Sequence, residues 1–485
     1  MQASKEDNSF KSLIKGTSIF GGVQVFQILI NLIRGKFIAL LLGPDGMGVN
    51  SMYVSSTALI QQFASLGINL SIVKEIASDK NTDNPNICNT TIHISIKLIF
   101  LTAILGFILC LIFSPVLSKL TFGDYSHIVE FAILSLMVFF TIASAGLSSI
   151  LQGLHVIKIL SKATLVGCIT GLIVGVPLYY IFGIKGIVPS MIILSISTFT
   201  FNLIGLKKTI TISWNPIDLN QYKDKVKHIL RLGFVLMAGT LIGTACTYLL
   251  NIIIREYGSI EAVGLYQSAN SITNQYVGLI FTAMSLDYFP RLSAISTDNL
   301  KMRELVNRQI IVTCIIVVPL LCLLILTAPL VIKLILADSF LSVVPLVRWL
   351  ALGLLFRSMC YPLGYITFAK GNEKRYFLLE GIFGNIIFYS ISILMFIRFG
   401  ILGLGIGLSI VYTINFILLL ILNNKWYEFK LEKTSLNKML IACFFVISCF
   451  ICTNLNESWF YSILSFLITL ISIIYSYIII RTNAK

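Results

Sequence analysis

The chain contains 485 residues, of which 57% are hydrophobic and 12% are charged. Because a typical soluble domain carries about 25% charged residues, this composition excludes an ordinary water-soluble protein and indicates one that crosses a membrane many times. The formal net charge is +15, and most of the lysines and arginines lie between the apolar segments or at their ends.

The apolar segments predict an all-α polytopic membrane protein. A membrane-crossing helix needs about 17 to 25 predominantly apolar residues, and this length predicts fourteen transmembrane helices. They lie near residues 17–42, 50–72, 91–115, 128–152, 162–182, 186–206, 229–254, 263–288, 309–336, 341–368, 376–397, 401–422, 439–454 and 459–480.

Two polar segments divide these spans into three groups. Residues 1–206 form a first lobe of six helices, and residues 229–422 form a second lobe of six. Residues 207–228 and 423–438 are cytoplasmic linkers, and residues 439–485 carry the last two helices. The first hydrophobic segment has no cleavage site of the kind found in signal peptides, so we expect it to remain as a helix.

The basic residues fix the orientation of the chain. With the N-terminus in the cytoplasm, most of the 36 lysines and arginines fall at cytoplasmic ends and loops. This asymmetry predicts that both termini are cytoplasmic and that the number of spans is even. The excess positive charge is then attracted to anionic lipid headgroups and gives no support for a nucleic-acid partner.

The two six-helix halves resemble each other weakly. Lys15 opens the first half as Arg231 opens the second, and a shift of 216 residues also relates Gly48 to Gly264. Since each half has six spans, the two copies share an orientation, and an internal duplication about an axis along the membrane normal is expected.

Polar residues recur at helical spacing in four of the predicted spans. These stripes suit either polar contacts between packed helices or a wet cavity between the halves, and their repetition in corresponding spans favours the cavity. The residues expected to line it are Gln24, Gln27, Asn31, Gln61, Asn251, Gln267, Asn270 and Asn274, together with Tyr361.

Cations inside the predicted spans are the strongest functional signal, because a charge at mid-bilayer is costly and usually faces a partner, a cavity or a ligand. Arg34 and Arg357 are the main candidates. Lys36 lies roughly 200° around the helix from Arg34, so it reaches the same cavity only if Gly35 loosens the turn. Arg348 is close enough to the outer end of its span to extend to the membrane surface.

Few acidic residues are available to neutralise these cations. Asp287 and Glu380 are the only candidates for proton or sodium coupling, and Asp287 could instead pair with Arg291 one turn away. Arginine binds phosphate through paired hydrogen bonds, and Asn, Gln and Tyr suit sugar hydroxyls. The pattern therefore favours a phosphate-linked glycan, with no cofactor and no metal site.

The front segment, KGTSIFGGVQVFQILINLIRGKFIALLLGPDGMGVNSMY, and the fourteen predicted spans resemble O-antigen translocases. These Wzx-type flippases belong to the multidrug/oligosaccharidyl-lipid/polysaccharide (MOP) exporter superfamily. The resemblance implies a V-shaped, MATE-like pair of helical bundles in the bacterial inner membrane. It also implies alternating-access transfer of an undecaprenyl-diphosphate-linked oligosaccharide to the periplasmic leaflet, without enzymatic chemistry.

The resemblance assigns roles to particular residues. Arg34 matches by position an arginine that lines the cationic cavity of the related lipid II flippases, and Arg357 is expected to share the diphosphate with it. Lys36 and Arg255 complete the expected cationic set. The two C-terminal helices would form a groove for the lipid tail, and membrane lipids and the polysaccharide polymerase machinery are the further expected partners.

Two other classes of function remain open at this point. A multidrug and toxin extruder of the same superfamily would use carboxylates in the first lobe to handle cationic drugs. A membrane polysaccharide polymerase or ligase would carry a large periplasmic loop with catalytic residues. The first predicted span contains no acidic residue, and the predicted outer loops are short, so the flippase is preferred to both.

Overall fold

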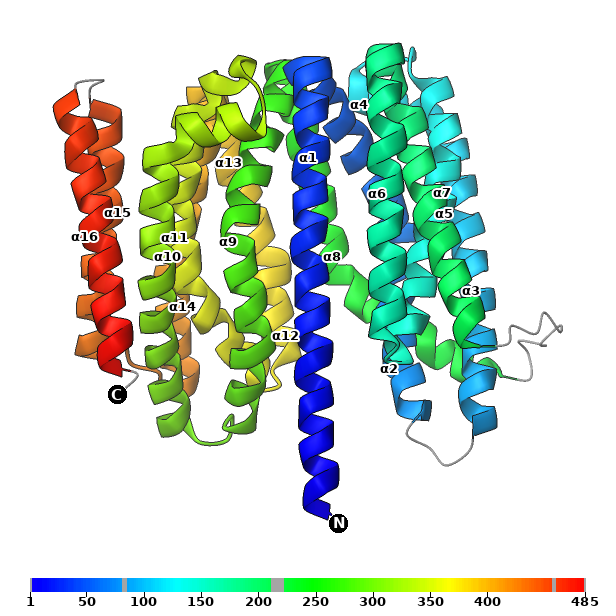
Figure 1. Cartoon of the computed structure of the whole chain (residues 1–485), viewed down its shortest axis with the longest axis horizontal. Helices are drawn as coiled ribbons and strands as arrows, with labels where there is room; N and C mark the ends of the chain where they lie inside the picture. The colour runs from blue at the N-terminus through cyan, green and yellow to red at the C-terminus, as the bar shows by residue number, and fades with distance from the viewer. Residues whose placement is uncertain (1, 81–84, 211–221, 456–458, 484–485) are drawn as a thin grey trace. The chain divides into compact units, whose positions relative to one another are not determined.

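The computed structural model describes residues 2–80, 85–210, 222–455 and 459–483, and throughout this part of the chain the secondary structure is helical (Figure 1). Contacts between residues divide the chain into two units, Met1–Ile252 and Ile253–Lys485. The predicted all-α fold class is therefore confirmed, and each unit can be described by itself.

The first unit contains nine helices over its described residues, the last of which crosses into the second unit. They are α1 (Gln2–Ala64), α2 (Ile68–Lys80), α3 (Pro85–Ile112), α4 (Ser114–Phe122), α5 (Ile128–Gly153), α6 (Ile157–Phe182), the 3-10 helix η1 (Gly183–Gly186), α7 (Ile187–Thr209) and α8 (Lys223–Tyr257).

The second unit continues with helices of the same kind. They are α9 (Ile260–Ala294), α10 (Asn299–Ile335), the 3-10 helix η2 (Asp338–Val343), α11 (Val344–Ala369), α12 (Glu373–Tyr376), the π-helical turn η3 (Phe377–Gly384), α13 (Asn385–Phe399), α14 (Ile401–Tyr427), α15 (Lys433–Leu455) and α16 (Trp459–Asn483).

Within the described residues, eleven helical segments are long and apolar enough to cross a membrane. Two of them, Val25–Ala64 and Ile157–Thr209, contain 40 and 53 residues, each enough for two crossings. Every predicted span overlaps a helix, but the spans near 50–72, 91–115, 341–368 and 376–397 each run across a boundary between two helical elements. The chain is therefore a multi-pass membrane protein, while the count of fourteen spans stays a prediction.

The turn between the first two predicted spans is a single break inside α1. Gly43 has φ 65° and ψ −167°, a conformation that glycine adopts without a side-chain clash. Pro44 follows at the start of the next helical segment, where its missing N–H costs nothing. The second segment therefore begins immediately after the break, several residues before the predicted start of the second span.

Glycines allow close approach between neighbouring helices in both units. Gly167, Gly171 and Gly175 occur at every fourth residue of α6 and face α7. In the second unit, Gly405 of α14 lies against Trp349 of α11. Small residues at such contacts let the backbones pack tightly. Because the hydrophobic effect does not drive helices together within a membrane, this close packing is a main source of their association.

Helix α8 contacts the first unit at several points along its length. His228 Nδ1 lies 3.0 Å from Glu75 Oε1 of α2, Lys225 forms an ion pair of 2.5 Å with Asp79, and Tyr248 hydrogen-bonds Thr121 of α4 at 2.7 Å. The sequence groups residues 229–254 with the second lobe because they follow the polar segment 207–228. These contacts instead attach most of α8 to the first unit, and the lobe boundaries as moving bodies stay a prediction.

The last two helices are held to the second unit by packing and by an arginine. Helices α15 and α16 lie side by side and contact α10 (Figure 1). Arg348 of α11 donates from Nη1 to the Thr453 carbonyl, at 2.7 Å, in the last turn of α15. The carbonyls of the last turn of a helix have no partner within that helix, so this one is free to accept the bond. That Arg348 extends towards the membrane surface stays a prediction.

The glycine stripe of α6 makes a testable prediction about stability. A Cβ atom added at Gly167 would lie 2.7 Å from Thr198 Cγ2 and 2.9 Å from Thr198 Cα, whereas at Gly175 the nearest atom is 3.6 Å away. Overpacking of this kind costs about 1–3 kcal/mol. We expect Gly167→Ala to lower the temperature at which the detergent-solubilised protein aggregates, and Gly175→Ala to leave it unchanged or raise it. Equal behaviour of the two variants would contradict this packing.

Candidate functional site

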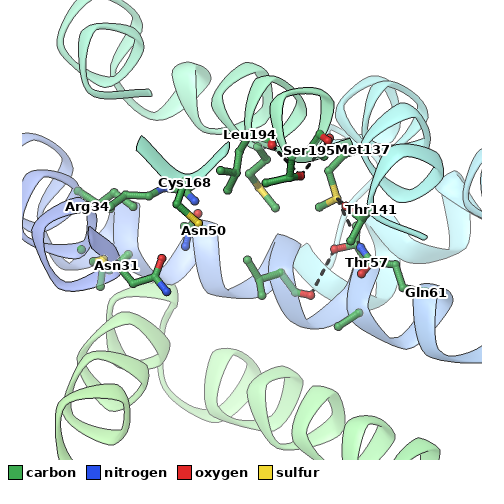
Figure 2. Close-up of a pocket in the computed structure, with 17 residues that line it drawn as sticks. Asn31, Arg34, Asn50, Thr57, Gln61, Met137, Thr141, Cys168, Leu194 and Ser195 are labelled. Carbon is green, nitrogen blue, oxygen red and sulfur yellow. Dashed lines mark hydrogen bonds between the residues drawn. The ribbon is translucent and has the colours of Figure 1, made fainter. Parts of the chain in front are cut away.

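A cavity of about 450 Å³ lies inside the first unit and is called here the Arg34 pocket. Its walls come from α1, α5, α6 and α7. The lining residues are Asn31, Arg34, Gly35, Ile38, Met47, Asn50, Val54, Thr57, Ala58, Gln61, Met137, Thr141, Cys168, Met191, Leu194, Ser195 and Thr198. Figure 2 shows Asn31 and Arg34 near one end of the cavity and Thr57, Thr141 and Gln61 near the other.

Arg34 is held by a neutral partner from a distant part of the chain. Its Nη2 and Nε donate to the phenol oxygen of Tyr179 on α6, at 3.1 and 3.3 Å. A hydrogen bond of 2.7 Å joins that oxygen to Ser190 Oγ of α7, and Tyr179 itself is almost completely buried. Among the described residues Arg34 forms no salt bridge, so its positive charge is oriented without being neutralised.

The rest of the Arg34 pocket mixes amides and hydroxyls with sulfur and apolar side chains. Gln61 donates to the sulfur of Met137 at 3.4 Å, and Gln27 is not among the lining residues. Asn50 Oδ1 is buried and has no hydrogen-bond partner. Because a buried acceptor of this kind is costly when unsatisfied, Asn50 offers a position for a ligand that donates a hydrogen bond.

The second unit has a smaller pocket, of about 220 Å³, between α11 and α14. We call it the Tyr361 pocket, and its lining residues are Arg357, Cys360, Tyr361, Gly364, Tyr365, Tyr412 and Asn415. The α11 members recur every three or four residues, so they form one face of that helix. No acidic side chain is among them.

Arg357 is positioned at the Tyr361 pocket by an amide relay and by aromatic rings. Its Nη1 donates to Asn274 Oδ1 of α9 at 2.7 Å, and Asn274 Nδ2 donates to Asn270 Oδ1 at 2.7 Å. The guanidinium carbon lies 5.4 Å from the ring centre of Phe281 and 5.7 Å from that of Tyr412. Cation–π attraction therefore supports the charge, and no carboxylate pairs with Arg357 within the described part of the chain.

The structure thus brings together two groups of the residues expected from sequence. Asn31, Arg34 and Gln61 share the Arg34 pocket, while Arg357 and Tyr361 line the Tyr361 pocket and Asn270 and Asn274 support it. Lys36, Arg255, Asn251 and Gln267 line neither pocket. The side chain of Gln24 lies outside the part of the chain whose side chains are described.

The two candidate coupling carboxylates have different surroundings. Asp287 accepts a hydrogen bond from Arg291 Nη2 at 2.8 Å, and both side chains are about two-thirds exposed. The pairing with Arg291 is therefore present. Glu380 lies in the π-helical turn η3, a local geometry that often marks functional positions, and its side chain is outside the described set.

Several residues at the two pockets were not singled out from sequence. They are Tyr179, Tyr412 and Asn415. Each lies in an apolar span, and the hydropathy pattern does not distinguish it from its neighbours. Tyr179 lies 145 residues from Arg34 along the chain, so only the fold reveals their contact. A phenol or amide in an apolar span is the available signal, and it also fits ordinary helix packing.

Solved structures of two membrane transport proteins have a fold similar to that of this chain. The fold matches the lipid II flippase MurJ in its inward closed conformation with a TM-score of 0.75 and 17% identity, covering 96% of this chain and 99% of MurJ. It also matches an inward-facing multidrug resistance MATE family transporter, with a TM-score of 0.68 and 17% identity over 81% of this chain and 93% of that one. At these identities the likeness shows the fold alone.

A third match is to a MOP superfamily transporter from Pyrococcus furiosus, whose title attributes to it a binding pocket of reversed polarity. The TM-score is 0.59 and the identity 17%, over 90% of this chain and 96% of that chain. The search of curated proteins gives no match. The family model described as "polysaccharide biosynthesis protein" matches residues 37–345. Since this is more than half of the chain, the protein belongs to that family.

The neutral partner of Arg357 gives a prediction for polysaccharide production. In Asn274→Asp the guanidinium gains a carboxylate partner, and attraction between unit charges about 4 Å apart reaches several kcal/mol at partly buried sites. The charge of Arg357 is then neutralised and less available to an anionic ligand. We therefore expect surface polysaccharide to fall about tenfold or more, and to fall further than in Asn274→Ala. Surface polysaccharide is measured by immunoblotting of cells that lack the chromosomal copy and express a tagged variant. The tag reports the abundance of the variant protein. A stronger defect in Asn274→Ala would contradict the account.

Proposed function

We propose that the protein is a flippase for an undecaprenyl-diphosphate-linked oligosaccharide, the repeat unit of an O-antigen or a similar surface polysaccharide. It carries this lipid across the bacterial inner membrane by alternating access, as Wzx-type translocases do, and performs no chemical reaction. The family and the MOP fold support a membrane transporter in polysaccharide biosynthesis.

The observation that carries this proposal is the state of the two arginines. Arg34 is held by a phenol, and Arg357 by an amide and aromatic rings. Each guanidinium has five N–H donors, so each can bind a phosphate oxygen pair while keeping its neutral support. A diphosphate brings the negative charge that these sites otherwise lack, and arginine is well suited to it.

Amide and hydroxyl groups near the arginines suit the glycan. Asn31, Asn50 and Gln61 in the Arg34 pocket provide donors and acceptors for sugar hydroxyls, and the unpaired Asn50 Oδ1 is an acceptor in need of a donor. Such groups in membrane helices would be costly if they served no contact. We propose that the glycan supplies that contact during transport.

The alternative functions fit the pockets less well. An extruder of cationic drugs needs acidic groups, and neither the Arg34 pocket nor the Tyr361 pocket has a carboxylate among its lining residues. A polymerase or ligase would carry a large periplasmic loop with catalytic residues, and the outer loops predicted from the sequence are short.

Three further assignments belong to this proposal. The protein resides in the inner membrane with both termini in the cytoplasm, which the distribution of basic residues supports. Membrane lipids and the polysaccharide polymerase machinery are its partners. Transport is coupled to a proton or sodium gradient only if Asp287 or Glu380 responds to it, and the pairing of Asp287 with Arg291 makes Glu380 the better candidate.

The arginines provide the direct genetic test. Removing one charge-assisted contact costs about 1.5–3 kcal/mol, which corresponds to roughly a 10- to 150-fold loss of substrate affinity. We therefore expect Arg34→Ala and Arg357→Ala each to leave lipid-linked oligosaccharide on the cytoplasmic leaflet of cells lacking the chromosomal copy. Extraction of radiolabelled lipids measures the accumulated lipid-linked oligosaccharide, and immunoblots measure the loss of surface polysaccharide.

A matched control separates this effect from a general change in basic charge. Lys185 lies in η1 with its side chain exposed, and it belongs to neither pocket. Lys185→Ala should restore surface polysaccharide as the unaltered protein does. Normal surface polysaccharide in Arg34→Ala, at normal protein abundance, would rule out the proposed role of this arginine.

A further inference from the structure

A histidine at one end of the first unit is hydrogen-bonded to a buried tyrosine. His127 lies between α4 and α5, and its Nδ1 is 3.0 Å from the hydroxyl oxygen of Tyr53 on α1. Tyr53 is 2% exposed, and its ring meets those of Phe122 and Phe131 with centres 5.1 and 5.4 Å apart. Because apolar rings enclose the phenol, its hydroxyl depends on His127 for a hydrogen-bond partner.

The imidazole is fixed in place but reached by water. The backbone N–H of His127 donates to Ser118 Oγ of α4 at 3.2 Å, and the ring lies 4.0 Å, centre to centre, from that of Phe122. The side chain of His127 is 30% exposed. A proton can therefore reach the ring without a rearrangement of the fold.

Glu130 of α5 is a second partner for the same nitrogen. Its Oε1 lies 3.9 Å from His127 Nδ1, and its Oε2 is buried without a hydrogen-bond partner among the described residues. A buried acceptor in this state is costly. The carboxylate is therefore stabilised by any donor that moves within reach.

The two charge states of His127 favour different partners. Histidine ordinarily changes charge between about pH 5 and 8. With the ring neutral and its proton on Nε2, Nδ1 accepts from the Tyr53 phenol. On the charged ring Nδ1 carries a proton and no longer accepts. A charge-assisted hydrogen bond is roughly twice as strong as a neutral one, so the charged ring favours Glu130 over Tyr53.

Other charged and titratable groups at this corner have partners of their own. They come from α3, α4, the loop after α4, and α8. Cys110 donates to the Phe131 carbonyl, Lys119 lies over the ring of Tyr125, Asp124 accepts from Ser126, and Tyr248 hydrogen-bonds Thr121. Glu130 is thus the carboxylate that faces the imidazole from the described residues.

Tyr53 connects this corner to the Arg34 pocket. It lies in the segment of α1 that follows the break at Gly43, and the same segment supplies Asn50, Val54 and Thr57 to the pocket wall. Thr57 Oγ1 also donates to the Tyr53 carbonyl at 2.6 Å. A loss of the bond between Tyr53 and His127 therefore loosens the wall that holds the polar groups of the pocket.

We propose that His127, Tyr53 and Glu130 form a proton-binding site that lowers the affinity of the Arg34 pocket for its anionic ligand. Helix α4 lies at the end of the first unit opposite the start of α1 (Figure 1), which the basic residues predict to be the periplasmic side. Acid on that side protonates His127, transfers its Nδ1 bond from Tyr53 to Glu130 and favours release of the ligand there. This inference rests on the proposed function and adds regulation by pH to it.

Binding of undecaprenyl diphosphate to the purified, full-length protein in lipid nanodiscs tests the inference, at about pH 7.5 and about pH 5.5. The diphosphate itself gains a proton over this range, so each variant is compared with the unaltered protein. His127→Asn keeps an acceptor for Tyr53 but does not titrate. We expect the affinity of the unaltered protein to fall about three- to tenfold more between the two pH values than that of His127→Asn, as expected for one neutral hydrogen bond.

Tyr53→Phe lacks the phenol and resembles the protonated state. It should bind about three- to tenfold more weakly than the unaltered protein at the higher pH, and its dependence on pH should match that of His127→Asn. This second variant keeps the aromatic ring, so the packing against Phe122 and Phe131 is preserved.

A second histidine serves as the matched control. His155 is exposed in the turn after α5 with φ 55°, a conformation that asparagine also adopts. His155→Asn should show the pH dependence of the unaltered protein. An equal pH dependence of His127→Asn and the unaltered protein, with binding intact, would overturn the inference and leave the proposed function standing. An absence of binding at both pH values would contradict the proposed function and with it the inference.

Discussion

The arrangement depends on the cost of placing a guanidinium inside a membrane helix. A charge at mid-bilayer costs at least about 2.5–3.5 kcal/mol on insertion scales, and a nearby carboxylate is the common remedy. Here the guanidinium of Arg34 meets the phenol of Tyr179, and that of Arg357 meets the amide of Asn274. Both supports orient the charge without neutralising it, and the proposed binding of an anionic ligand rests on this observation.

Holding an arginine this way requires rigid surroundings. Tyr179 is placed by the tight contact of α6 with α7, which the glycines of α6 permit, and Ser190 of α7 fixes its hydroxyl. Asn274 is placed by Asn270 one turn earlier on α9. The same helix-packing chemistry that holds a membrane protein together thus sets the geometry of the two cations.

Much of this account follows from the sequence, but not all of it. Hydropathy and the length of a membrane-crossing helix identify the long apolar helices but not short separate ones such as α2 and α4. The scarcity of acids beside Arg34 and Arg357 is visible in the sequence itself. Partners that lie far apart along the chain are not visible. Tyr179 is 145 residues from Arg34, and the carbonyl that accepts a hydrogen bond from Arg348 is 105 residues away. Helical periodicity gives the face of one helix, while tertiary packing decides what that face meets.

The central claim is that the protein moves a diphosphate-linked glycan lipid between leaflets. The most direct measurement uses the purified protein in liposomes loaded with a fluorescent undecaprenyl-diphosphate glycan, with a membrane-impermeant quencher added outside. If the account is right, the protein accelerates the loss of protected fluorescence as lipid reaches the outer leaflet, and Arg34→Ala at the same protein density does not. A rate equal to that of protein-free liposomes, or an equal acceleration by Arg34→Ala, would contradict it.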